Sequence, residues 1–393
     1  MGLRASLIEI YRRIMPLGKE GADFIYLNGE NNLYPYEIEG VISNSPTAYR
    51  ASLLNAKFIA GAGVLNEETD KVYTYKELPF VNKKKAYKIT DIINMSAEDL
   101  STQGGSWFHV GWGIGEDGLL KQTHIDVLPY CRPRKAKEDD DKNLGKIYFK
   151  DWRDKAKFGQ KKSQVKWFYP YSPDLNVVKT QIKADAGLSG DLEDFTEAIK
   201  KYRGQVFYLN LTPRFEYALS PFDSVYNDCD TEYRMGLYTN KETREGFMGK
   251  VIVVTSGLDE QQEKNVNADI GEWLGSEDAG NIQIFNAEAG ADPTKVVFLQ
   301  QLKPQLDDDR FVNTDKRIKR HILGVADNIP EPMIYASDGM FGTTEGAFEQ
   351  YKLFYSEQTE PKREKLQETL AYLGFPVIIE PIVRKVTVQT PTP

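Results

Sequence analysis

The chain has 393 residues, of which 40% are hydrophobic and 27% charged, and a formal net charge of −8. This composition excludes a collagen-like, coiled-coil or wholly disordered chain, and the length allows two or three domains. No apolar run approaches the roughly 18–20 residues that span a bilayer, so we expect no membrane partner. Proteins that grip nucleic-acid backbones tightly are usually basic, and the acidic excess disfavours that class.

The first half of the sequence alternates helical and strand-like segments. Pro46 follows a capping Ser45 and predicts a helix start inside a helical stretch that begins near residue 36. Two aromatic or β-branched runs flank Gly111–Gly118 and predict a hairpin. The charged stretch 131–146 is interpreted as an exposed loop. The elements expected in this half are helices 36–62, 90–100 and 191–202 and strands 106–110, 119–127, 146–150, 165–171 and 205–211.

The glycine-rich turn of that hairpin contains Gly113, Gly115 and Gly118, which formally match G-x-G-x-x-G. A dinucleotide site requires this motif to lead from a strand into a helix, whose N-terminus receives the pyrophosphate. Here strand-like residues and then Pro129 follow the motif. We therefore expect no nucleotide site and no cofactor.

The second half contains two long helices separated by a short α/β segment. Ser220, Pro221 and Asp223 predict a helix start, since they supply a capping oxygen, a preset φ and a negative charge at the positive helix end. That helix should reach about Arg244. A β-α-β-β pattern follows, with strands 250–254, 281–285 and 295–299 and a helix over 259–274.

The second long helix begins near Asp307–Asp309 and ends in a basic cluster before Gly324, which favours the helix dipole at both ends. The cluster is explained either by this dipole and by pairing with neighbours or by contact with a polyanion; its members are Lys316, Arg317, Lys319, Arg320 and His321. A loop over 333–346 leads into a helix over 347–373. Pro361 should kink or break this last helix, and Gly374 should end it.

This order of elements, together with several local strings, resembles the portal protein (head–tail connector) of tailed double-stranded-DNA bacteriophages. The strings are Asn31–Pro35 with Ser43–Thr47, Ser220–Asp223, Asn240 to Met248, Gly275 with Ala279–Asn281, and Ile318–Pro330. The last string departs from the family's usual pattern, because Leu323 often corresponds to a Phe and Ala326–Asn328 precede Ile329–Pro330.

The resemblance implies an α+β, multidomain subunit that assembles into a ring. Its expected segments are a wing (1–219), a first stem helix (220–245), a β-α-β-β clip (246–306), a second stem helix (307–328), a tunnel loop (329–346), a long kinked helix under the crown (347–374) and a C-terminal strand or short crown (375–393).

The implied function is that of a structural virion protein, a dodecameric ring at one capsid vertex through which the genome is packaged and ejected. The implied partners are the major capsid protein or scaffold, the terminase large subunit, the head–tail adaptor and double-stranded DNA, bound without sequence specificity. The implied location is the virion, and the host cytoplasm during assembly. The tunnel-loop residues that would face DNA are Tyr335, Asp338, Met340, Phe341, Thr343 and Thr344; the stem charges that would face the channel or a neighbouring subunit are Lys316, Arg317, Lys319 and Arg320.

The alternative is a metal-dependent enzyme that cleaves phosphodiesters with clustered carboxylates, such as Asp139–Asp141 or Asp307–Asp309. Loop acids and helix starts explain these clusters more simply. Nucleophilic catalysis would need a base beside a Ser or Cys, and the chain has only three histidines, His109, His124 and His321. His109 and His124 are expected on the two arms of one hairpin. We therefore predict no catalytic and no metal-binding residues.

Overall fold

The structure is a computed structural model. It describes residues 19–22, 24–115, 118–137, 145–153, 165–188, 195–244, 251–256, 261, 264–265, 282–287, 308–335 and 345–383. The chain divides into two compact units, Met1–Asp230 with Ile318–Pro393 and Thr231–Arg317. Both helices that connect the units, α7 (Tyr226–Arg244) and α10 (Asp308–Val325), begin in one unit and end in the other. The predicted mixed α+β class is confirmed.

The first unit is organised around a six-stranded sheet of order β8-β7-β12-β11-β10-β9. All neighbours are antiparallel except β11 and β12, which are parallel. The strands are β7 (Gly105–Ile114), β8 (Leu120–Leu128), β9 (Pro133–Lys135), β10 (Ile147–Phe149), β11 (Lys166–Pro170) and β12 (Gln205–Asn210). The predicted hairpin is confirmed, because β7 and β8 pair on either side of the glycine-rich turn.

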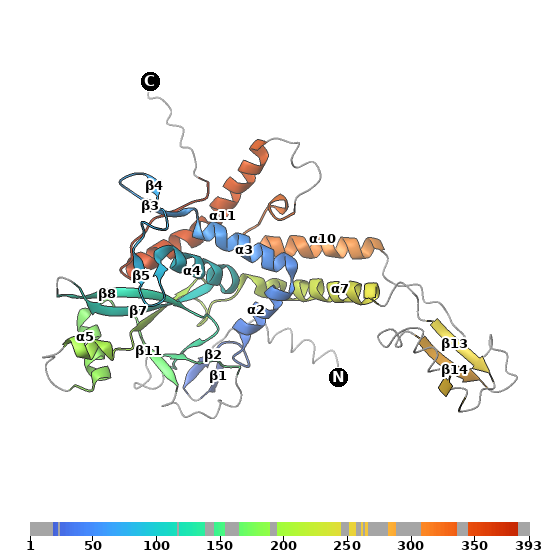
Figure 1. The fold of residues 1–393 in the computed structure, drawn as a ribbon, viewed down its shortest axis with the longest axis horizontal. Coiled ribbons are helices and arrows are strands. Elements are labelled where there is room, and N and C mark those ends of the chain that lie inside the picture. Colours follow the sequence, from blue (N-terminus) through green and yellow to red (C-terminus); the bar gives the residue numbers. More distant parts are fainter. Residues whose placement is uncertain are drawn as a thin grey trace, which may run out of the picture. The chain divides into compact units, whose positions relative to one another are not determined.

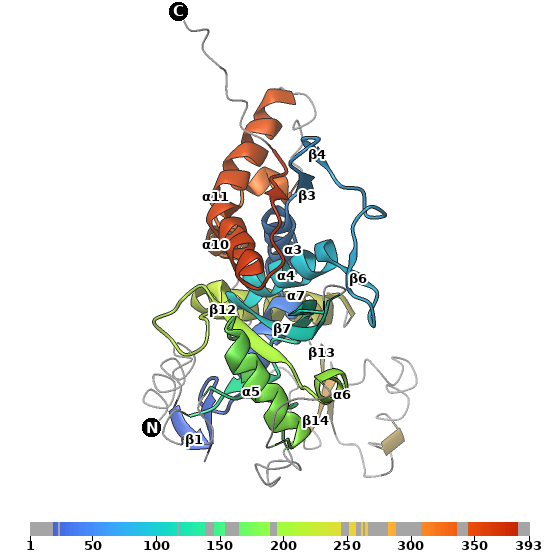
Figure 2. The same ribbon diagram turned by 90° about the vertical axis from the view of Figure 1, so that its left-hand side faces the viewer.

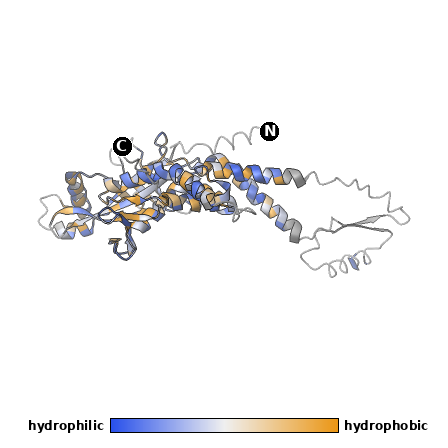
Figure 3. Cartoon of the chain, turned by 90° about the horizontal axis from the view of Figure 1, so that it is seen from above, coloured by the Kyte–Doolittle hydropathy of each residue, from blue (hydrophilic) through white to orange (hydrophobic). Residues whose placement is uncertain are grey.

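Side chains alternate between the two faces of this sheet, as the pleat of a strand requires. Phe108 and Val110 of β7 pack into the main hydrophobic core, whereas Trp107 packs into a second cluster with Phe168 and Val206. Figure 3 shows hydrophobic residues distributed through the sheet and helices of this unit. The sheet therefore has an apolar layer on each face.

Three helices lie in layers over the main-core face. They are α4 (Ile89–Gln103), α3 (Pro46–Ala60) and α11 (Glu345–Tyr372), and Figures 1 and 2 show α4 between the sheet and the other two. The helix α2 (Tyr34–Asn44) precedes α3, and Ser45 caps α3 by accepting a hydrogen bond from Ala48 N. This is the interruption that the Ser45-Pro46 pair predicts. Leu366, Leu370 and Leu373 of the α11 end complete the core.

The helix α11 continues through Pro361, and its two halves run in different directions in Figure 1. A proline cannot donate the helical hydrogen bond and its ring crowds the preceding turn, which accounts for the bend. Gly374, with φ of 86°, ends the helix as predicted: its N donates to Ala371 O and Phe375 N donates to Leu370 O. The predicted kink is thus present and the predicted break is not.

The remaining elements of the first unit are short. Several were not predicted, among them α5 (Leu175–Ala186), which packs Val178 and Ile182 beside Trp112, and the hairpin of β1 and β2. The other elements are β1 (Lys19–Ala22), β2 (Ile25–Leu27), β3 (Gly63–Asn66), β4 (Lys71–Val72), β5 (Phe80–Asn82), β6 (Tyr87–Lys88), α6 (Phe195–Lys200), η3 (Pro221–Val225), η5 (Glu331–Met333) and β15 (Ile379–Glu380).

The interpretation of residues 131–146 as an exposed loop is wrong for the part that the structure describes. Residues Pro133–Lys135 form β9 and pair with β10, and Arg134 is fully buried. Its guanidinium donates to the carbonyl oxygens of Cys131, Pro133 and Asn32. A buried charge is tolerated when its donors are all directed at acceptors, and the run of charges in the sequence gives no sign of that environment.

In the second unit the structure describes two strands, β13 (Val251–Ser256) and β14 (Ile282–Ala287), which pair in parallel over six residue pairs. Parallel neighbours require a crossover connection, and residues 257–281 are long enough to supply one. The predicted strand 295–299 and most of the predicted helix 259–274 lie outside the described residues.

Candidate functional site: the ends of the two long helices

The start of the first long helix is anchored to α2 and α4. Ser220 Oγ accepts a hydrogen bond from Phe222 N at 3.1 Å and donates to Thr102 O at 2.5 Å. Ser220 N donates to Tyr34 Oη at 3.1 Å, and Pro221 occupies the first turn. The structure therefore begins a helix where these residues predict one, as a 3-10 turn (η3) that continues into α7.

Asp223 lies half-buried in this first turn. Burial raises the pKa of its carboxyl to about 6, and the hydrogen bond from the Tyr34 hydroxyl opposes part of this rise. Burial also raises the pKa of the Tyr34 hydroxyl, and the nearby charge of Asp223 adds to this rise. The helix dipole favours the charged form of Asp223 at this position, whereas burial favours its protonated form.

The end of the second long helix differs from its prediction. Gly324 was expected just past the helix, but it lies inside α10. The chain leaves the helix at Asp327 and Asn328, whose φ angles of 60° and 55° are left-handed. Asn328 N donates to Gly324 O and Ile329 N to Leu323 O, which satisfies the last helical carbonyls. Asp and Asn are the non-glycine residues that best tolerate this conformation, so the inserted Ala326–Asn328 segment forms the helix end.

Residues of α3 and α11 hold this helix end in place. Tyr355 Oη donates to Ala326 O at 2.9 Å and accepts from Asn55 Nδ2 at 2.7 Å. Asp327 Oδ2 accepts from Asn55 Nδ2 and from Lys362 Nζ, both at 2.7 Å. Tyr355 is fully buried, and burial raises the pKa of its hydroxyl. The four side chains join α3, α10 and α11 at one point.

The two long helices also contact each other directly near these ends. His321 Nδ1 of α10 lies 3.0 Å from Asp228 Oδ2 of α7, with the two side chains 50% and 25% exposed. Ile318 and Ile322 of α10 and Phe222, Val225 and Cys229 of the first helix are buried. The helix ends are therefore paired by side chains at the surface, and each helix buries apolar side chains nearby.

The four predicted stem charges lie along α10. Lys316, Arg317 and Arg320 are exposed, whereas Lys319 is half-buried with its Nζ 5.3 Å from the centre of the Tyr335 ring. Tyr335 lies at the end of the described part of the predicted tunnel loop, and its hydroxyl lies 2.5 Å from Thr47 Oγ1 of α3. Tyr335 thus packs against its own chain. The other predicted loop residues, Asp338, Met340, Phe341, Thr343 and Thr344, lie outside the described residues.

The two histidines of the hairpin lie in surroundings typical of a structural role. His109 and His124 lie on β7 and β8 with ring centres 5.6 Å apart, on the hairpin arms where they were expected. Burial lowers the pKa of both, to about 4 for His109, whose Nε2 lies 2.9 Å from Arg203 O. Burial therefore favours the neutral form of both rings.

The carboxylate clusters of the alternative hypothesis are only partly described. Asp139–Asp141 and Asp307 lie outside the described residues, and Asp308 and Asp309 begin α10. Within the described ranges, no group of three or more His, Cys, Asp or Glu residues is placed to hold a metal ion.

In the same ranges, no helix has the length and apolar character needed to cross a membrane.

No protein-family model matches the chain, and no curated protein matches its sequence. Among solved structures, it is similar to a chain from the neck of an empty gene transfer agent particle, computed with C6 symmetry, with a TM-score of 0.53 and 12% identity. The match covers 96% of this chain and 91% of that one. A chain from the virion of a native gene transfer agent particle matches with a TM-score of 0.50 and 12% identity over 89% of this chain and 85% of that one.

These matches show that the chain shares its fold, over nearly its whole length, with a chain found in the neck of a phage-like particle. The resemblance to a connector-type protein is thereby confirmed at the level of the fold.

Proposed function

We propose that the chain is a structural protein of a phage-type virion, the subunit of the portal ring at one capsid vertex. The observation that carries this proposal is the shared fold, which extends over 96% of this chain and 91% of a chain from a particle neck. A likeness of this extent includes the two long helices, the segment between them and the domain from which they arise. In this proposal twelve subunits form the ring.

The charge of the chain supports a channel rather than a DNA clamp. Fixed cations that neutralise phosphates add affinity and would hold a translocating duplex in place. The net charge of −8 per subunit, repeated around a ring, leaves a surface along which DNA slides. The exposed Lys316, Arg317 and Arg320 then serve as a single weak basic belt or as pairing groups between neighbouring subunits.

The remaining assignments follow from the resemblance. Residues 246–306 are the clip where the terminase large subunit and later the head–tail adaptor dock, and the wing contacts the major capsid protein or scaffold. Because Tyr335 contacts α3 of its own chain, the loop residues proposed to face double-stranded DNA are those beyond it, from Asp338 to Thr344.

The experiment that tests this function measures packaged DNA in the producing cells. A stop codon at the start of the coding sequence should leave capsids that contain no nuclease-protected DNA, because no channel is present at the vertex. An intact copy supplied in trans is the control and should restore the protected DNA. Particles with normal DNA content in the absence of the chain would contradict the proposal.

A further inference from the structure

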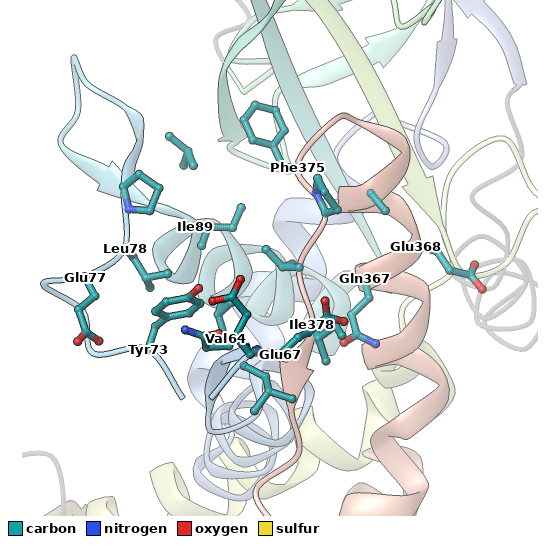
Figure 4. A pocket seen from close by; sticks show the side chains of 18 residues that line it. Val64, Glu67, Tyr73, Glu77, Leu78, Ile89, Gln367, Glu368, Phe375 and Ile378 are labelled. Atoms are coloured by element: carbon teal, nitrogen blue, oxygen red, sulfur yellow. Dashed lines mark hydrogen bonds between the residues drawn. The ribbon is translucent and has the colours of Figure 1, made fainter. Parts of the chain in front are cut away.

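The first unit contains an open groove that the proposed function does not use. It encloses about 1010 Å³ between the β3–β4 hairpin with its following loop on one side and the end of α11 with residues 375–378 on the other. Figure 4 shows Val64, Leu78, Ile89, Phe375 and Ile378 among the residues that line it. Val64, Leu78 and Ile89 are buried, so the floor is a fixed apolar surface.

The rim of the groove is acidic. Four glutamates line it, Glu67, Glu68, Glu77 and Glu368, and among the described residues no lysine, arginine or histidine does. Glu77 accepts a hydrogen bond from Thr74 N, and Glu368 pairs with Lys365 at 2.9 Å. Glu67 and Glu68 are exposed on the β3–β4 turn. An apolar floor below a negative rim suits an extended segment that carries apolar side chains and positive charge.

The C-terminal segment of the chain, residues 384–393, has this chemistry. It begins with Arg384 and Lys385, contains no acidic residue, and places Val386 and Val388 at alternate positions. In an extended segment, side chains two residues apart point to the same side, so these valines can face one apolar surface together. Ten residues reach at most about 33–36 Å, enough to lie along a groove of this size.

The direction of the chain favours a groove on another subunit. The segment that lines the groove ends at Ile378, and β15 then pairs antiparallel with β3, placing Ile379 opposite Val64 and Glu380 opposite Gly63. Glu380 O accepts a hydrogen bond from the N of Ala62, the residue just before β3 begins. The groove instead includes the other end of β3 and the turn that follows it, up to Glu68. The chain thus leaves its own groove as it passes Glu380.

We propose that this groove binds the C-terminal segment of a second copy of the chain, with Arg384 and Lys385 at the glutamate rim and Val386 and Val388 on the apolar floor. The inference rests on the proposed ring for the neighbouring copy. The groove's affinity for the segment is a property of one subunit and can be measured whether or not a ring forms.

The first test measures binding of a fluorescent peptide with the sequence of residues 381–393 by anisotropy. The receptor is the full chain with Arg384→Glu and Lys385→Glu, so that its own segment does not compete. We expect saturable binding that weakens at least tenfold when Glu67→Lys and Glu68→Lys are added. Glu98→Lys with Glu364→Lys is the matched control: both residues are exposed, neither lines the groove, and binding should persist. Absent binding, or equal weakening by both pairs, would overturn the proposal.

The second test distinguishes the source of the segment. Glu68→Cys and Val388→Cys are combined in the full chain, whose native Cys131 and Cys229 are buried. After oxidation, a series of covalently linked chains in a denaturing, non-reducing gel would support a segment from another copy. A covalently closed monomer, or no crosslink, would overturn that assignment. The native mass measured separately reports on the ring itself, so failure of the ring and failure of the groove give different results.

Discussion

At the scale of single residues, several ionisable groups are buried or half-buried at positions where burial disfavours their charged form. Arg134 is fully buried and donates hydrogen bonds to backbone carbonyls and to the side chain of Asn32. Asp223 is half-buried, with its pKa raised to about 6. Such groups stabilise a unique arrangement only while their hydrogen bonds are intact, because an unpaired buried charge is costly.

Asp223→Asn tests the raised pKa of this carboxyl. Its folded value of about 6 exceeds the ordinary value of 3.8, so the folded chain binds more protons between these pH values and loses stability as the pH rises through this window. Asparagine does not titrate. Relative to the unsubstituted chain, the variant should gain about 1 kcal/mol in unfolding free energy between pH 4 and pH 7, after discounting for solvent screening.

Urea unfolding at several pH values measures this difference. Asp174→Asn, at an exposed helix cap on α5, is the matched control for replacing a capping aspartate with asparagine. A pH-independent difference between Asp223→Asn and the unsubstituted chain would contradict the raised pKa.

At the scale of elements, the end of α10 depends on contacts with α3 and α11. The Tyr355 hydroxyl donates to Ala326 O and accepts from Asn55, while its ring packs edge to face on Phe58 with centres 4.9 Å apart. The position of the second long helix is therefore set by a helix about 30 residues later in the chain and by one about 270 residues earlier.

Tyr355→Phe should remove this hydroxyl and keep the ring contact. Losing both hydrogen bonds at a fully buried position should lower the free energy of unfolding by about 1–2 kcal/mol. Tyr351→Phe, one turn earlier and 40% exposed, should change it by less than about 0.5 kcal/mol. Chemical denaturation of both variants makes the comparison, and equal effects would mean that the hydroxyl does not hold the helix end.

The sequence predicted elements whose signals are local. Ser45-Pro46 and Ser220-Pro221 mark helix starts because a capping oxygen and a fixed φ act within one turn. The left-handed Asp327 and Asn328 were not predicted, because Gly324 offered the more usual helix end and the contacts with Asn55 and Lys362 come from distant helices. The burial of Arg134 was missed for the same reason, since its acceptors are backbone carbonyls with no signature in the sequence.

At the scale of the whole molecule, the proposed function rests on the shared fold and on the acidic net charge of the chain. Neither the fold nor the charge specifies function alone: one fold supports many functions, and net charge bears on association rather than fold. Together they are the basis of the proposal of a ring that conducts DNA rather than a protein that holds it. Residues 336–344 of the predicted tunnel loop and most of the predicted clip lie outside the described residues, so the roles given to them stay predictions from the resemblance.

The measurement that tests the central claim most directly is the native mass of the purified full-length chain, with negative-stain images of the same peak. The account predicts a mass near twelve times 44.7 kDa and annular end views with a central channel. A monomer or dimer that cleaves DNA with Mg²⁺, and loses this activity on Asp139→Ala or Asp308→Ala, would contradict the account and favour the phosphodiester-cleaving enzyme.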